Sequence, residues 1–221
     1  MLYKTRGVVF RFTRYGETSI IVTIFTEAFG IQTYIVNGVR TKSAKNKIAL
    51  FQPLTLLELV VYHKENASIL RMKEVKCLHP YHHIGRDIYK TCVGLFLNEI
   101  LNKAVREESH AAELCTFLID SLIALDESQE PENFHLIFLV HLSRLLGFGA
   151  QIPADIWGGV SPDSRIDERL RNLLQAGYGT SLAFTGTERQ ELLTLLLRFF
   201  AAHIESLGEL KSVAVLREVL R

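Results

Sequence analysis

The apolar residues of this chain change their spacing near residue 80, and this change limits the folds that the chain can adopt. Before that point the apolar segments are short, rich in β-branched and aromatic residues, and separated by turn-like segments such as 26–30 and 63–67. This pattern is typical of β-strands. We expect strands around Val8–Phe10 and over Ser19–Phe25, Ile31–Val36, Leu54–Tyr62 and Ile69–Val75.

Five short strands are too few for two stacked sheets with a good core, so a small closed or nearly closed barrel is the economical solution. The connection from Gly38 to Pro53 should then form a long loop or a short helix on the rim of the barrel.

From about Pro80 the apolar residues recur at helical spacing. We expect a barrel domain over residues 1–79 and a helical domain over 80–221, with an irregular, cysteine-free segment at about 147–186 that holds one short helix and Trp157 as a packing anchor. The predicted helical faces are Ile88, Cys92, Leu95, Phe96 and Ile100 in one helix, and Phe134, Ile137, Phe138, Leu142, Leu145 and Leu146 in another.

The carboxyl-terminal helices have their own signals. Thr187 to Gln190 fits a capping box. The following stretch, Leu192–Phe200, is apolar nearly all round and should be the central buried helix. A last helix is expected over Lys211–Leu220.

Composition excludes several classes of protein. Apolar residues make up 48% and charged residues 22%, which is ordinary for a globular chain, and no apolar run reaches the ~18–20 residues that cross a bilayer. No secretory signal is evident, and three scattered cysteines cannot build a disulfide framework. We therefore expect a cytoplasmic protein, associated with the nucleoid if it binds DNA.

Enzyme signatures are missing from the sequence. It contains no Gly-rich phosphate loop and no Gly-x-Ser-x-Gly nucleophile motif. A triad assembled from distant residues stays open at this point. Cys77, His79, His82 and His83 lie within seven residues, but they lack the spacing of a structural zinc site, so we interpret them as a polar joint between the domains.

Charge is distributed unevenly along the chain. Residues 1–80 hold twelve Lys or Arg and five Asp or Glu, a net charge of +7, whereas residues 81–221 hold thirteen and nineteen, a net charge of −6. Such asymmetry favours a polyanionic partner for the first part, and a merely solvated basic face is the alternative.

The basic residues of the barrel are interleaved with aromatic residues, as in proteins that bind single-stranded nucleic acid. Arg6 has a second interpretation as a structural strand residue, and Phe10 and Phe12 are expected in the core. The predicted phosphate contacts are first Arg40, Lys42, Lys45 and Lys47 and then Lys4, Arg6, Arg11 and Arg14, with Tyr15 and Tyr34 as rings for base stacking.

Short motifs along almost the whole chain resemble the bacterial recombination mediator RecO family, in the family's order. They include Arg6-Gly7-Val8-Val9, Tyr15-Gly16-Glu17-Thr18-Ser19, Phe25–Gly30, Val36–Arg40, Phe51–Leu54, Arg144–Phe148 and Leu210-Lys211-Ser212.

The resemblance implies an amino-terminal OB-fold, a five-stranded barrel, followed by a mainly helical domain. It implies a DNA repair and recombination protein that is not an enzyme and uses no nucleotide cofactor. Such a protein binds single- and double-stranded DNA, anneals complementary strands, contacts the single-strand binding protein and, with RecR, helps load RecA. The family's barrel motif transfers to Arg6, Gly16, Glu17, Phe25, Gly30, Gly38, Ser43 and Pro53, with the glycines as turn formers.

The chain departs from the family pattern in one respect. Many members carry a four-cysteine zinc module after the motif that reads Leu145–Phe148 here, but residues 149–185 contain no cysteine, so no metal is implied. For the acidic tail of the single-strand binding protein, Arg86 and Lys90 are the candidate contacts. An RNA-binding OB module and a protein-only adaptor are the rival functions.

Overall fold

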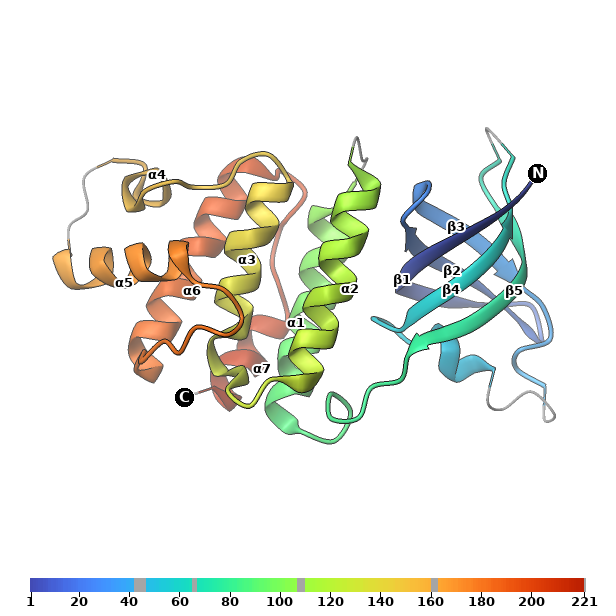
Figure 1. The fold of residues 1–221 in the computed structure, drawn as a ribbon, viewed down its shortest axis with the longest axis horizontal. Coiled ribbons are helices and arrows are strands. Elements are labelled where there is room, and N and C mark those ends of the chain that lie inside the picture. Colours follow the sequence, from blue (N-terminus) through green and yellow to red (C-terminus); the bar gives the residue numbers. More distant parts are fainter. Residues whose placement is uncertain (42–46, 65–66, 107–109, 160–162, 221) are drawn as a thin grey trace. The chain divides into compact units, whose positions relative to one another are not determined.

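In the computed structural model the chain forms two compact units, described over residues 1–41, 47–64, 67–106, 110–159 and 163–220 (Figure 1). The first unit contains residues 1–81 and 105–123, and the second contains residues 82–104 and 124–221. The predicted domain boundary after residue 79 remains a prediction. The predicted fold class, an α+β chain with a five-stranded amino-terminal barrel followed by helices, is confirmed.

Five strands close into a barrel in the order β1-β2-β3-β5-β4. Neighbours pair antiparallel except β3 and β5, which are parallel, so the last two strands cross over as a Greek key does. All five strands were predicted, and β1 is longer than expected. The strands are β1 (Leu2–Tyr15), β2 (Ser19–Thr26), β3 (Gly30–Val36), β4 (Leu56–Tyr62) and β5 (Leu70–His79).

Strand β1 belongs to both sides of the barrel. Residues Leu2 to Val8 pair with β4, and residues Gly7 to Tyr15 pair with β2, so Gly7 and Val8 join both neighbours. A register shift between Val9 and Arg11 interrupts the ladder with β2. Such a bulge bends a strand and increases its twist, which lets one strand serve both neighbours.

The barrel interior is filled by alternate residues of the strands. Val9, Val22, Leu57 and Val61 are buried there, and Phe51 joins them from the short 3-10 helix η2 (Ile48–Phe51) between β3 and β4. Of the two alternatives predicted for the connection 38–53, a long loop or a short helix, the described part contains the short helix η2.

Tyr34 lies in this core, and the prediction that its ring is available for base stacking is wrong. Its side chain is fully buried because its two cross-strand neighbours, Val22 and Leu70, also point inward. Burial raises the pKa of its hydroxyl. Among the described residues, that hydroxyl has no hydrogen-bond partner.

The helices follow the barrel along the chain. Within the second unit, α3 packs against α1, α5 and α6. Helix α2 begins in the first unit and ends in the second. The helices are α1 (Ile88–Ala104), α2 (Ala111–Glu127), α3 (Phe134–Leu145) after the 3-10 turn η3 (Pro131–Asn133), α4 (Pro153–Trp157), α5 (Ser164–Gln175), α6 (Gly186–His203) and α7 (Ser212–Val219).

The most completely buried helix is α3, not α6 as predicted. Every residue from Phe134 to Val140 is buried. Helix α6 buries most of its leucines but leaves Thr194 and Arg198 exposed. The predicted inner face of α1 is also only partly right, because Ile88 and Leu95 are 60% and 56% exposed.

The irregular segment at 147–186 contains two helices, α4 and α5, of which α4 was not predicted. Trp157 ends α4 and is half-buried, in agreement with its interpretation as an anchor. No helix in the described part of the chain is long and apolar enough to span a membrane.

The capping box of α6 lies two residues earlier than predicted. Thr185, not Thr187, is the N-cap: its hydroxyl accepts the N–H of Glu188, and the Glu188 carboxylate accepts the N–H of Thr185. Arg165 and Arg169 also donate to Glu188, each at 3.1 Å. The backbone bond from Thr185 and the bond from Arg169 lower the pKa of Glu188 to about 2.

Replacing Tyr34 by Phe should raise the melting temperature slightly and leave DNA affinity unchanged. The substitution removes a buried hydroxyl whose desolvation costs about 1–3 kcal/mol when no partner compensates it. Thermal melting and a DNA-binding titration of Y34F test this. A large loss of DNA affinity with an intact fold would contradict the core position of Tyr34.

Replacing Glu188 by Gln should lower stability near pH 7 by about 1 kcal/mol, because Gln keeps the cap but not the charge that faces the two arginines. Since the pKa of Glu188 is lowered from its usual 4.5 to about 2, this stabilisation is complete above pH 4.5 and is lost as the pH falls toward 2. Melting curves of both proteins should therefore converge below pH 4.5. A constant gap down to pH 3 would show that the charge is not responsible.

Candidate nucleic-acid interface

The outer face of β1, β2 and β3 carries basic residues without acidic ones. After the bulge in β1, Phe12 packs against the core, whereas Arg11 and Tyr15 are exposed on the other side of the strand. The sequences of these three strands contain no Asp or Glu, and Glu17 and Glu27 lie in the turns that connect them.

The register places an arginine of β5 in line with this face. On the outer side, Thr13 of β1 pairs with Ile21 of β2, Ile21 with Ile35 of β3, and Ile35 with Arg71 of β5. Arg71 is exposed, and among the described residues no ion pair involves it. A search for runs of basic residues along the sequence does not find Arg71. The alternation of inward and outward residues in β5 could have placed its side chain on the outer face.

The turn between β1 and β2 brings Arg40 to the same end of the face. The Arg40 guanidinium donates to the carbonyl of Gly16 at 3.0 Å, and its backbone N–H donates to the carbonyl of Thr18. Gly16 and Gly38 have φ values of 55° and 70°, so the predicted turn roles of these glycines are confirmed. Arg40 therefore lies beside the turn that follows Tyr15.

We call the set Arg11, Arg14, Tyr15, Arg40 and Arg71 the basic strip. Tyr15 is 53% exposed, and Arg11 is exposed on the outer side of β1. Arg14 lies on the same side of the strand as Phe12, since its partner Ile20 is in the core, and it is exposed near the end of the strand. The strip combines guanidinium groups for phosphates with a ring on which a base can stack.

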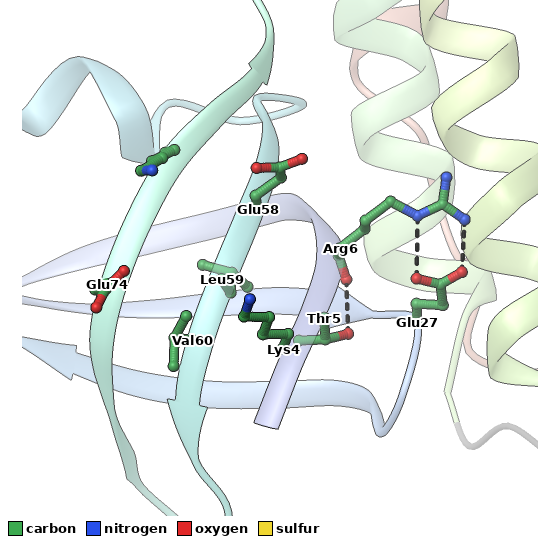
Figure 2. A pocket seen from close by; sticks show the side chains of 9 residues that line it. Lys4, Thr5, Arg6, Glu27, Glu58, Leu59, Val60 and Glu74 are labelled. Atoms are coloured by element: carbon green, nitrogen blue, oxygen red, sulfur yellow. Dashed lines mark hydrogen bonds and ion pairs between the residues drawn. The ribbon is translucent and has the colours of Figure 1, made fainter. Parts of the chain in front are cut away.

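The other outer face, formed by the first half of β1 with β4 and β5, has mixed charge. It contains a pocket of about 450 Å³ (Figure 2). Three carboxylates share this pocket with three basic side chains, so it does not suit a polyanion as the basic strip does. The charged residues lining it are Lys4, Arg6, Lys76, Glu27, Glu58 and Glu74.

Arg6 is engaged in a structural ion pair, which supports its second interpretation. Its Nε donates to Glu27 Oε2 at 3.0 Å and its Nη2 to Glu27 Oε1 at 2.5 Å (Figure 2). Nη2 also donates to the hydroxyl of Thr116 in α2. The hydrogen bond from Arg6 lowers the pKa of Glu27, and that bond raises the pKa of Arg6. Each charge of the pair therefore holds the other in its ionised form.

The remaining predicted residues fall in different places. Lys47 is exposed at the start of η2, and Lys4 is exposed beside the mixed pocket. Lys42 and Lys45 lie outside the described residues. The basic strip thus unites Arg11, Arg14, Tyr15 and Arg40 of the predicted set.

Lys90 cannot serve as the predicted partner contact, because its side chain is buried. It is 5% exposed, and its ammonium group donates to the backbone carbonyl of Asp126 at 2.7 Å. Arg86, in contrast, is exposed and precedes two exposed apolar side chains of α1, Ile88 and Tyr89.

The histidines after the barrel are held by a buried carboxylate. Asp126 accepts the backbone N–H groups of His82, His83 and Ile84, each at 2.8 Å. Burial alone would raise the pKa of Asp126, but these bonds outweigh it and lower the pKa. Within the described residues, no group of three or more His, Cys, Asp or Glu side chains is arranged to hold a metal ion.

Comparison with known proteins covers nearly the whole chain. Residues 1–81 match the family model "Recombination protein O N terminal", and residues 85–213 match "Recombination protein O C terminal". A "DNA repair protein RecO" of Flavobacterium psychrophilum is 33% identical over 236 residues, and one of Bacteroides fragilis is 34% identical over 243, each covering 99% of both chains. A third, from Porphyromonas gingivalis, is 25% identical over 98% of both chains.

The motifs quoted from the barrel and from the helical part therefore belong to one continuous similarity, and the chain is a member of the recombination protein O family of DNA repair proteins.

Proposed function

We propose that this protein binds DNA through the basic strip and pairs complementary single strands without covalent chemistry. The observation that carries the proposal is the acid-free outer face of β1, β2 and β3 with the exposed side chain of Arg11, together with the exposed Arg14 near the end of β1. Family membership and the names of the relatives, all DNA repair proteins, support DNA as the polyanion.

Strand pairing is limited by repulsion between two phosphate backbones. Guanidinium groups of the strip neutralise phosphates and release their counterions. With about 4–6 phosphates contacted, the logarithm of the binding constant should fall against the logarithm of salt concentration with a slope of about −3 to −4. A strand held in this way is less repulsive toward its complement, and its bases remain available for pairing.

The partners proposed for this activity are RecR and the single-strand binding protein, with RecA recombinase loaded afterwards on the bound strand. The acidic second part of the chain suits protein contacts better than DNA. For the acidic, apolar tail of the single-strand binding protein, Arg86 beside Ile88 and Tyr89 offers a positive charge next to exposed apolar surface.

A double variant, Arg11→Gln with Arg14→Gln, tests the strip. It should make the salt slope for single-stranded DNA shallower by about one to one and a half, because two phosphate contacts are lost, and it should slow the annealing of complementary strands coated with the single-strand binding protein. Fluorescence anisotropy and a strand-annealing assay measure these effects.

The matched control is Lys76→Gln with Arg171→Gln, which removes the same two charges from exposed positions outside the strip. It should behave like the unmodified protein. Equal effects of both double variants would show that net charge, not the strip, governs binding. Failure of the unmodified protein to accelerate annealing would refute the proposed function.

The Arg86→Glu variant should weaken binding of a peptide with the tail sequence of the single-strand binding protein by about tenfold, because a favourable charge contact becomes repulsive. Peptide titration measures this, with Arg171→Glu as the control. Unaltered affinity would remove Arg86 from the partner site.

A further inference from the structure

Tyr62 is an outward-facing ring at the end of β4 that the basic strip does not include. It is 49% exposed, and its cross-strand neighbour on β1, Leu2, is 47% exposed. Val61, which precedes Tyr62 in β4, is fully buried. Because successive side chains of a strand point to opposite sides, Tyr62 points outward. The apolar face of the Tyr62 ring is therefore in contact with water.

A cluster of rings holds this end of the strand in place. The imidazole of His63 stacks on Phe29 with ring centres 3.9 Å apart and planes 3° apart, and Tyr3 packs edge-on against both rings. The backbones of Met1 and His63 exchange hydrogen bonds that tie β1 to β4 at this point. Tyr62 therefore extends from a fixed backbone.

Basic side chains surround Tyr62. Arg71 is its cross-strand neighbour on β5, Lys64 is two residues further along the chain, and Lys4 is diagonal to it on β1. All three are exposed. The nearest carboxylate in the register is Glu74, which pairs with Val60. Positive charge therefore predominates around the ring.

The basic strip leads directly to this ring. The outer row of Thr13, Ile21, Ile35 and Arg71 continues to Tyr62, because Arg71 pairs with Ile35 on one side and with Tyr62 on the other. Four steps between neighbouring strands measure roughly 19 Å along the curved wall of the barrel. A single strand that follows this wall can run from Thr13, two residues before Tyr15, to Tyr62.

We infer that Tyr62 is a stacking platform for an unpaired base of single-stranded DNA, with Arg71 binding the adjacent phosphate. The inference rests on the proposed function and adds to it the distinction between single strands and duplex. Bases of a duplex are already stacked and paired, so a ring on the protein surface gains contact only with an unpaired base. The guanidinium groups of the strip attract phosphates of either form, and Tyr62 adds to Tyr15 a second ring that selects the single strand.

The test compares Tyr62→Leu, which keeps an apolar side chain of similar reach, with Tyr62→Phe, which keeps the ring. Anisotropy titrations use a labelled oligothymidylate, a duplex of equal length and an abasic strand with the same number of phosphates. We expect Y62L to bind the oligothymidylate about five- to a hundredfold more weakly, with duplex affinity and salt slope unchanged. Y62F should bind like the unmodified protein.

The abasic strand isolates the stacking contribution. The preference of the unmodified protein for the base-bearing strand should shrink in Y62L, because part of that preference comes from the ring. Equal preference in both proteins, or equal weakening of single-strand and duplex binding, would overturn the inference and point instead to a protein-contact role for Leu2 and Tyr62. Thermal melting of Y62L verifies that the exposed substitution leaves the fold intact.

The two proposals fail in different ways. If the strip is wrong, the Arg11 and Arg14 double variant keeps its affinity for both forms of DNA. If only the role of Tyr62 is wrong, that double variant still loses affinity, while Y62L retains the ratio of single-strand to duplex binding.

Discussion

The pairing of β1 with two neighbouring strands is the constraint on which the two outer faces of the barrel depend. Residues Leu2 to Val8 pair with β4, and the ladder with β2 runs from Gly7 to Tyr15, with a register shift between Val9 and Arg11. Arg6 and Arg11 are therefore close in sequence but have different neighbours. A bulge at the shift bends the strand and increases its twist.

The two outer faces therefore carry different charges, although a count of charged residues along the sequence adds them together. At the mixed pocket, Glu27 from the turn between β2 and β3 is ion-paired with Arg6, and Glu58 and Glu74 balance Lys4 and Lys76. On the β2 side, three strands without acids leave the arginines uncompensated. The net charge of the amino-terminal part favours a polyanionic partner. The register decides which face carries arginines without neighbouring carboxylates.

Much of the fold could be predicted from spacing alone. The alternation of apolar residues located all five strands, and helical spacing located α3, α5, α6 and α7, because both periods are local properties. Burial was harder to predict, since it depends on partners that are distant in sequence. Tyr34 is flanked by residues that suit a surface strand, yet its pairing with Val22 and Leu70 turns it inward.

The site was predicted less completely for the same reason. Lys90 was chosen for its place at the start of a helix, but the carbonyl of Asp126, thirty-six residues away, binds its ammonium group inside the unit. Arg71 and Tyr62 were overlooked because they become neighbours of the strip only through the β3–β5 and β4–β5 pairings. The charge runs in the sequence pointed to β1, but they could not show which other strands share its outer face.

The most direct measurement of the central claim is hydroxyl-radical footprinting of the protein with and without a bound oligothymidylate. We expect protection of side chains along the outer face of β1, β2 and β3, with Tyr15 and Ile35 among them, and no protection of Val60 in the mixed pocket. Protection centred on that pocket, or spread evenly over the barrel, would contradict the division of charge described above.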